Sequence, residues 1–385
     1  MITLLSQIFL KNKEDTKKRQ AYGTLCSIVG IMLNILLFAG KYIAGLISGS
    51  VAVMADAFNN LSDAGSSFVT LAGFLFAGKK PDSDHPFGHG RFEYISGFVV
   101  SVAILMMGLE LLKSSITKIV HPEPVDTGML SLVIIAASIL VKLYMAFYNQ
   151  RIGKRIDSAA MLATAVDSLS DMVATTVVLI AMLVMKYTGI NIDGICGLLV
   201  AVFILYAGIK AAKETMDPLL GMAPSKELVE RIEEIVMSHD NIEGIHDLVV
   251  HDYGPGRRMV SLHAEVPGNC NIFEIHDRID HIERELKEEL DCETVIHMDP
   301  IEVDNEEIKK MKKIVAEAVK QVHKDMTVHD FRMVPGPTHT NLIFDAVMPY
   351  GMKLSKSEVK KEIEDIVEGL HGDYFAVVDI DQSYV

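Results

Sequence analysis

Tryptophan is absent from the 385 residues, aromatic residues make up only 7%, and the four cysteines form no CxxC motif. The cysteines therefore predict no disulfide framework, and their use suits a reducing cytosol. The apolar N-terminus is short and no small-residue cleavage site follows it, so we predict no signal peptide. No nucleophile motif or phosphate-binding glycine loop stands out either, so the sequence does not predict an enzyme.

Acidic and basic residues are distributed unevenly along the chain. Residues 215–385 hold 36 Asp and Glu against 18 Lys and Arg, a net charge of −18, whereas residues 1–214 carry +3. The acidic half lacks the basic surface that nucleic acids require, so we expect no nucleic-acid partner. Because half of all residues are apolar, the contrast predicts an apolar membrane region followed by a soluble region.

Six stretches of the first half are long enough to cross a bilayer as helices. They are residues 21–47, 51–78, 92–117, 128–149, 158–186 and 190–212. The flanks that would lie on the side of the termini hold 13 Lys and Arg against 3 on the other side. The positive-inside rule therefore places both termini, and the acidic half, in the cytoplasm.

Two of these stretches carry carboxylates, which are costly inside a bilayer unless they are paired or serve a function. Asn59 and Asp63 are four residues apart in the second, as are Asp167 and Asp171 in the fifth. On a helix each pair shares one face, so two packed helices would bring an amide and three carboxylates together. Each buried carboxylate costs roughly 2.5–3.5 kcal/mol. The alternative is that these polar residues only hold the two helices together. Such contacts do not need a net charge, so we favour a cation site.

The donor atoms restrict the ion. All-oxygen ligands suit Mn²⁺, Mg²⁺ or Ca²⁺, whereas imidazole or thiolate ligands suit Zn²⁺. The quartet contains no histidine, which favours a harder ion.

The soluble half reads as the same order of elements twice. Residues 225–240, 244–254, 257–267, 273–290 and 293–300 predict helix, strand, strand, helix and strand, and alternation marks the second strand. The order recurs in residues 306–323, 328–334, 341–349, 355–370 and 374–380, and Ile245-His-Asp-Leu is echoed by Val328-His-Asp-Phe. We therefore predict two tandem αββαβ domains of the ferredoxin-like α+β type.

The first copy brings a metal-ligating set onto three strands and a helix. The set comprises His246, His263, His276, His297 and Asp299, and His297 and Asp299 share a strand face. The second copy keeps a histidine but otherwise offers carboxylates at the matching positions: His329, Asp345, Asp379 and Asp381. It either holds a harder metal ion or has lost binding and only packs on the first copy or widens the dimer.

With these residues and several further stretches, the chain resembles the cation diffusion facilitators. The stretches are Gly49-Ser-Val-Ala-Val, Asp82-Ser-Asp-His85-Pro-Phe-Gly-His89-Gly90-Arg91, Ile245-His246-Asp247-Leu, Val260-Ser-Leu-His263 and Val295-Ile-His297-Met-Asp299-Pro300. The resemblance implies a homodimeric divalent-metal/proton antiporter. Zinc members place His-xxx-Asp where this chain has Asp167-xxx-Asp171, so it looks like the manganese branch. The second soluble copy departs from the common pattern.

The resemblance also implies roles for two further groups. Asp82, His85 and His89 match a loop that carries a second metal site in the family, although a capped polar loop explains them equally well. Arg91 and Asp217 match charges that interlock the membrane and cytoplasmic regions in relatives.

Together these features predict an α-helical membrane protein with four regions: a cytoplasmic N-terminal segment (residues 1–20), a six-helix domain (21–214), and two αββαβ domains (215–303 and 304–385). The predicted function is efflux of a divalent metal ion, Mn²⁺ first, across the cell membrane in exchange for protons. Efflux of Zn²⁺, Fe²⁺ or Co²⁺ is the alternative, followed by a membrane-anchored metal sensor without transport.

Overall fold

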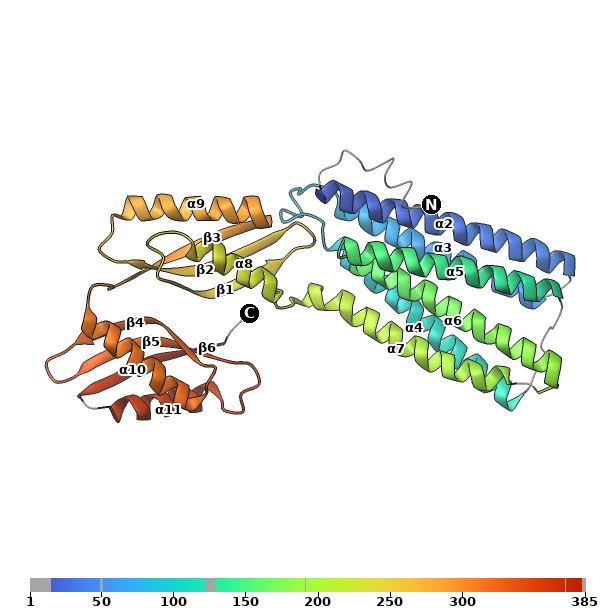
Figure 1. Cartoon of the computed structure of the whole chain (residues 1–385). Coiled ribbons are helices and arrows are strands. Elements are labelled where there is room, and N and C mark those ends of the chain that lie inside the picture. The colour runs from blue at the N-terminus through green and yellow to red at the C-terminus, as the bar shows by residue number, and fades with distance from the viewer. Residues whose placement is uncertain (1–14, 49–50, 122–128, 191, 371, 383–385) are drawn as a thin grey trace. The chain divides into compact units, whose positions relative to one another are not determined.

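The computed structural model describes residues 15–48, 51–121, 129–190, 192–370 and 372–382 (Figure 1). The chain divides into two compact units. Unit 1 comprises Met1–Met222 and Tyr253–Gly256, and unit 2 comprises Ala223–Asp252 and Arg257–Val385. Most of the predicted cytoplasmic N-terminal segment, residues 1–14, lies outside the described residues.

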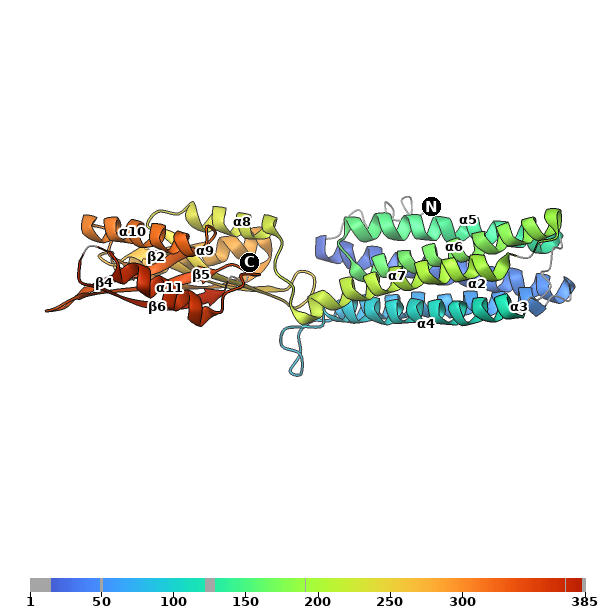
Figure 2. The ribbon, with the colours of Figure 1, turned by 90° about the horizontal axis from the view of Figure 1, so that it is seen from below.

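Unit 1 is a bundle of long helices that run side by side (Figures 1 and 2). They are α2 (Asp15–Ser48), α3 (Val51–Ala77), α4 (Phe92–Val120), α5 (Met129–Arg155), α6 (Ala159–Thr188) and α7 (Asp193–Leu220). At 1.5 Å per residue each exceeds the roughly 30 Å of a hydrocarbon core.

Five of these helices are long and apolar enough to cross a membrane: α2, α4, α5, α6 and α7. The search covers the described residues only, and α3 is not among the five. This helix carries Asn59, Asn60 and Asp63, which lower its apolar character. Five helices of the membrane domain are therefore apolar enough to span a bilayer, and the sixth span, α3, remains a prediction.

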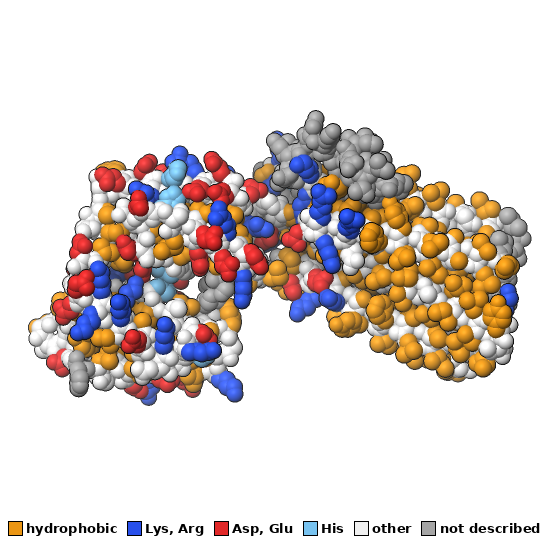
Figure 3. All heavy atoms as spheres, viewed as in Figure 1, with side chains coloured by type: hydrophobic (Ala, Val, Ile, Leu, Met, Phe, Trp, Pro, Cys, Tyr) orange, Lys and Arg blue, Asp and Glu red, His pale blue; other side chains and the backbone are white. Residues whose placement is uncertain are grey.

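The outer surface of unit 1 is apolar and its interior is partly polar, the reverse of a soluble bundle. Exposed side chains include Leu36, Met106 and Leu199, and Figure 3 shows that hydrophobic side chains cover most of the visible face of this unit. Buried among the helices are Asn60, Asp63, Thr70, Lys142 and Asp167. Such an arrangement suits a lipid solvent outside and a functional polar centre inside.

Arg19 of α2 ties together one end of the bundle. Its guanidinium donates to the buried Glu93 carboxylate of α4, with 3.0 Å between Nη2 and Oε1. It also donates to the carbonyls of Ile156 and Asp157, at 2.6 and 2.7 Å. These bonds fix the connection into α6, where Ser158 caps the helix by accepting from the Met161 N–H.

Unit 2 consists of two αβ segments. The first contains α8 (Lys226–Met237), β1 (Gly244–Asp252), β2 (Arg258–Pro267), α9 (Ile272–Leu290) and β3 (Cys292–Ile301). The second contains α10 (Glu306–Val322), β4 (Thr327–Pro335), β5 (Thr340–Met348), α11 (Lys356–Glu368) and β6 (Tyr374–Gln382). The helix and strand order predicted from the sequence is therefore present in both halves.

Each segment has its own three-stranded sheet, with the orders β1-β2-β3 and β4-β5-β6. In both, the first two strands pair antiparallel and the last two pair parallel, the latter joined by a crossover helix. Each segment also has a separate apolar core, around Leu262 and Ile282 in the first and Phe344 and Ile363 in the second. Division into domains at residues 215–303 and 304–385, and their origin by duplication, remain proposals.

Candidate metal sites

Three carboxylates meet inside unit 1. Asp63 of α3 and Asp167 and Asp171 of α6 each offer an oxygen, and these atoms all lie within 4.8 Å of one another. Asp63 and Asp167 are buried, with 8% and 6% of their surface exposed. A hydrogen bond of 2.9 Å between Thr70 and Thr164 links α3 to α6. The two helices thus hold the three acids face to face.

The amide beside these acids is not the one that the sequence spacing predicts. Asn59 is exposed, whereas Asn60 is 4% exposed and its Nδ2 donates to Asp63 Oδ2 over 3.4 Å. The Asn60 Oδ1 atom is buried without a hydrogen-bond partner. Both three- and four-residue spacings share a helix face, so the sequence could not choose between the two asparagines.

Lys142 of α5 completes the group, and the sequence analysis missed it. Its Nζ donates to Asp63 Oδ2 and to Asp171 Oδ2, both at 2.6 Å, and its side chain is 2% exposed. An ammonium group therefore bridges carboxylates from two helices at the position where a bound cation would lie. A lone lysine in the apolar run Met129–Tyr148 was the available signal, because a buried intramembrane charge requires a partner.

Coulomb attraction explains why these groups converge. Three carboxylates in an apolar bundle repel one another strongly, and an ammonium at hydrogen-bond distance offsets part of that repulsion. Lys41 of α2, which is also buried, adds a second positive charge near Asp63, and two positive charges against three carboxylates leave the group net negative. The arrangement can therefore accept a divalent cation, provided that Lys142 gives up at least one of its two carboxylate partners.

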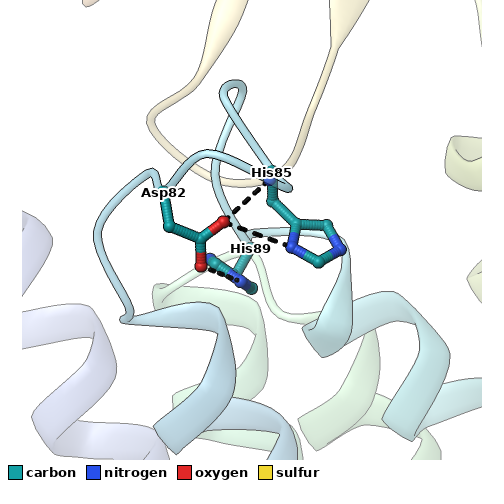
Figure 4. Close-up of side chains that lie close together, drawn as sticks. All are labelled: Asp82, His85 and His89. Atoms are coloured by element: carbon teal, nitrogen blue, oxygen red, sulfur yellow. Dashed lines mark hydrogen bonds and ion pairs between the residues drawn. The ribbon is translucent and has the colours of Figure 1, made fainter.

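A second group of possible metal ligands lies on the loop between α3 and α4 (Figure 4). Asp82 lies 3.4 Å from His85 Nδ1 through one oxygen and 3.4 Å from His89 Nε2 through the other. The His85 backbone N–H donates to Asp82 Oδ1 at 2.8 Å, which lowers the pKa of that carboxyl. The Nδ1 atom of buried His89 has no hydrogen-bond partner, so the trio fits either a weak metal site or a capped loop.

The first αβ segment aligns three histidines across its sheet. His246, His263 and His297 are direct neighbours in the strand register. Asp299 joins them, with its carboxylate 2.9 Å from His263 Nδ1, 3.2 Å from His246 Nε2 and 3.4 Å from His297 Nε2. Four of the five predicted residues are therefore together.

His276 is the exception. It lies on α9, its side chain is 62% exposed, and its Nδ1 is 3.7 Å from Asp280 on the same helix. No described group of metal-ligating side chains includes it. The sequence analysis grouped it with the cluster as a possible ligand on the second helix, and within one chain it lies apart from the other four residues; its role as a ligand remains a prediction.

The second segment matches the first position by position. His329, Asp345 and Asp379 are neighbours across its sheet, as the three histidines are in the first. His329, Asp345 and Asp381 form a group within 4.8 Å, whereas Asp379 is exposed and outside it. Burial raises the pKa of Asp345 to about 6, and Asp381 adds to the rise. Burial, reinforced by the nearby His246, lowers the pKa of His329.

Arg91 occupies the N-cap position of α4 without a side-chain capping hydrogen bond, and Asp217 lies in the last turn of α7. The ion pair between them remains a prediction.

Comparison with known proteins identifies the architecture. Residues 27–220 match the model of the cation efflux transmembrane domain, which is half of the chain. The chain belongs to the cation diffusion facilitator family. Residues 224–301, the first αβ segment, match the cytoplasmic domain of cation efflux proteins. Cation diffusion facilitators are transporters rather than enzymes, and the centre in unit 1 lies in the matched transmembrane region.

Three relatives illustrate the similarity. The uncharacterized transporter MJ0449 of Methanocaldococcus jannaschii is 34% identical over 65% of this chain and 88% of its own length. The manganese efflux system protein MneS of Bacillus subtilis is 28% identical over 75% and 98%. The cation-efflux pump FieF of Escherichia coli (strain SMS-3-5) is 26% identical over 74% and 96%.

Proposed function

We propose that this cation diffusion facilitator exports a divalent metal ion in exchange for protons, and that Mn²⁺ is its preferred substrate. The observation that carries the proposal is the buried group of Asp63, Asp167 and Asp171. Its donors are all oxygens, which favour Mn²⁺ over softer ions. A relative named for manganese efflux agrees with this choice.

The mechanism follows from the charges in the group. A metal ion arriving from the cytoplasm displaces Lys142 from the carboxylates, together with any protons that they hold. Rocking of the helices around this centre then exposes the ion to the other side. Protons from that side, together with the returning ammonium group, compete for the same oxygens and release the metal.

Placement in the cell follows from the sequence and the family. We place the protein in the cell membrane as a homodimer, with both termini and unit 2 in the cytoplasm. Six spans, with α3 as the polar one, give this topology. The two αβ segments are tandem copies, of which the first matches the family's cytoplasmic domain.

Two other functions have less support. Efflux of Zn²⁺, Fe²⁺ or Co²⁺ would use the same mechanism with a different ion. A membrane-anchored sensor without transport would need no charged bundle interior, so the buried acids and Lys142 count against it.

Metal selectivity gives the direct test of the proposal. A pH gradient is imposed across the membrane of inside-out vesicles that contain the protein. The uptake of Mn²⁺, Zn²⁺ and Fe²⁺ into these vesicles is then compared. We expect gradient-dependent uptake with Mn²⁺ preferred. Asp167→His introduces an imidazole donor and should shift the preference towards Zn²⁺ by roughly tenfold. Unchanged selectivity in this variant would contradict the ligand assignment.

The two asparagines offer a matched pair. Asn60→Ala removes the amide that lies beside Asp63, and Asn59→Ala removes the exposed one. We expect the Asn60 variant to raise the KM for Mn²⁺ about tenfold, the lower end of the loss on removing a metal-site residue. The Asn59 variant should leave KM within about twofold. The reverse order would restore Asn59 as the ligand that the sequence spacing predicts.

A further inference from the structure

The two αβ segments of unit 2 meet through a histidine from each. The rings of His246 on β1 and His329 on β4 are stacked with centroids 4.2 Å apart. Both residues stand at a β-bulge, where the strand register shifts after His246 and after His329. The next residue in each case, Asp247 or Asp330, has a positive φ, of 52° and 49°. Bulges of this kind re-aim side chains, here towards the other segment.

Polar contacts surround this pair. Glu265 of β2 is 5% exposed, and its carboxylate accepts from Lys312 of α10 at 3.1 and 3.2 Å. It also accepts from the backbone N–H of Asp330 at 3.4 Å. The segments keep separate apolar cores, so their junction relies on polar groups that must be satisfied there.

The nitrogens of His329 are not satisfied within the described residues. Both ring nitrogens of His329 are buried without a hydrogen-bond partner, whereas His246 Nε2 lies 3.2 Å from Asp299 and its Nδ1 lies 3.4 Å from Asp247. The side chains are only 8% and 7% exposed. A buried polar atom without a partner destabilises the fold, so two of them on one ring require an explanation.

Two carboxylates approach the Nε2 atom of His329 at distances that suit a bridging ion. Asp247 Oδ1 and Asp381 Oδ2 each lie 3.9 Å from His329 Nε2. These separations are too long for hydrogen bonds. Ligands about 2.1 Å from a tetrahedral metal ion lie roughly 3.4 Å from one another, so a small closure would suffice. His246, Asp247 and His329 already form a group within 4.8 Å.

We propose that His246, Asp247 and His329 bind one divalent cation between the two αβ segments, with Asp381 as a further ligand. The mixed imidazole and carboxylate set fits Zn²⁺ best, and also accepts Mn²⁺, Fe²⁺ or Co²⁺. The ion clips the second segment onto the first, so the second segment completes a site that the first cannot form alone. This site does not depend on transport through unit 1.

Zinc counting on the full-length protein in detergent tests the proposal. The Zn²⁺ content per chain is measured after equilibrium dialysis against Zn²⁺ alone, for the wild type, His329→Ala, Asp247→Asn and the double variant. We expect each single variant and the double variant to lose the same single equivalent of Zn²⁺, because the residues share one ion. His323→Ala, a histidine of the second segment outside every described group, should lose none.

Thermal unfolding separates binding from a merely structural role. Zn²⁺ should raise the Tm of the wild type and of His323→Ala, and this rise should vanish in His329→Ala while the metal-free Tm is retained. Unchanged zinc content in His329→Ala, or the loss of two equivalents in the double variant, would overturn the proposal. Repeating the count in an Asp171→Ala background, where transport should fail, keeps this test distinct from that of the proposed function.

Discussion

Replacing Asp171 by alanine should reduce Mn²⁺ uptake into inside-out vesicles by roughly 100-fold or more, with no rescue at high Mn²⁺. Asp171 contributes one of three converging carboxylates and accepts from Lys142 at 2.6 Å. Its removal deletes a ligand and leaves the ammonium group to pair with Asp63 alone. Both effects act on the bound ion, so we expect the loss in the rate of transport as well as in KM.

The control is a carboxylate on a neighbouring helix that takes no part in the group. Glu110 of α4 is exposed, and Glu110→Ala should keep uptake within about twofold, in the range of ordinary surface substitutions. Gel filtration of both variants checks that they fold and assemble equally. If Asp171→Ala retains more than about a tenth of wild-type uptake, the converging carboxylates do not form the site through which the ion is transported.

Local spacing predicted what depends on one helix or one strand. Asp167 and Asp171 share a face of α6 because they are four residues apart, and alternation placed His263 on β2 opposite its core neighbours. The echo of Ile245-His-Asp-Leu in Val328-His-Asp-Phe corresponds to the same bulge in both sheets. In these cases the sequence periodicity carries the geometry directly.

Packing between elements was harder to predict. The spacing could not decide between Asn59 and Asn60, since both are within one turn of Asp63. It could not show that α9 directs His276 away from the histidine row, or that His329 stacks on His246 from a strand 83 positions later. These contacts depend on how helices rotate and how two αβ segments meet, which a one-dimensional pattern does not contain.

Lys142 belongs to the same class and matters most for the mechanism. In the sequence, Lys142 is a single basic residue in an apolar stretch, and no local pattern indicates which residues it contacts. In the structure, it occupies the carboxylate group as a cation tethered to α5. A tethered competitor has a high effective concentration and never diffuses away. In the proposed mechanism, this competition would weaken metal binding at rest and hasten release at the outer side.

Exchanging Lys142 for methionine, which keeps length and apolar volume but not charge, should therefore separate affinity from turnover. We expect the KM for Mn²⁺ to fall about tenfold, equivalent to roughly 1.4 kcal/mol of competition removed, and kcat to fall because release slows. Lys186→Met, the same change at an exposed position of α6, should alter neither. A raised KM in Lys142→Met would show instead that the ammonium group holds the carboxylates in place for the metal, so that the competition argument fails while the site remains.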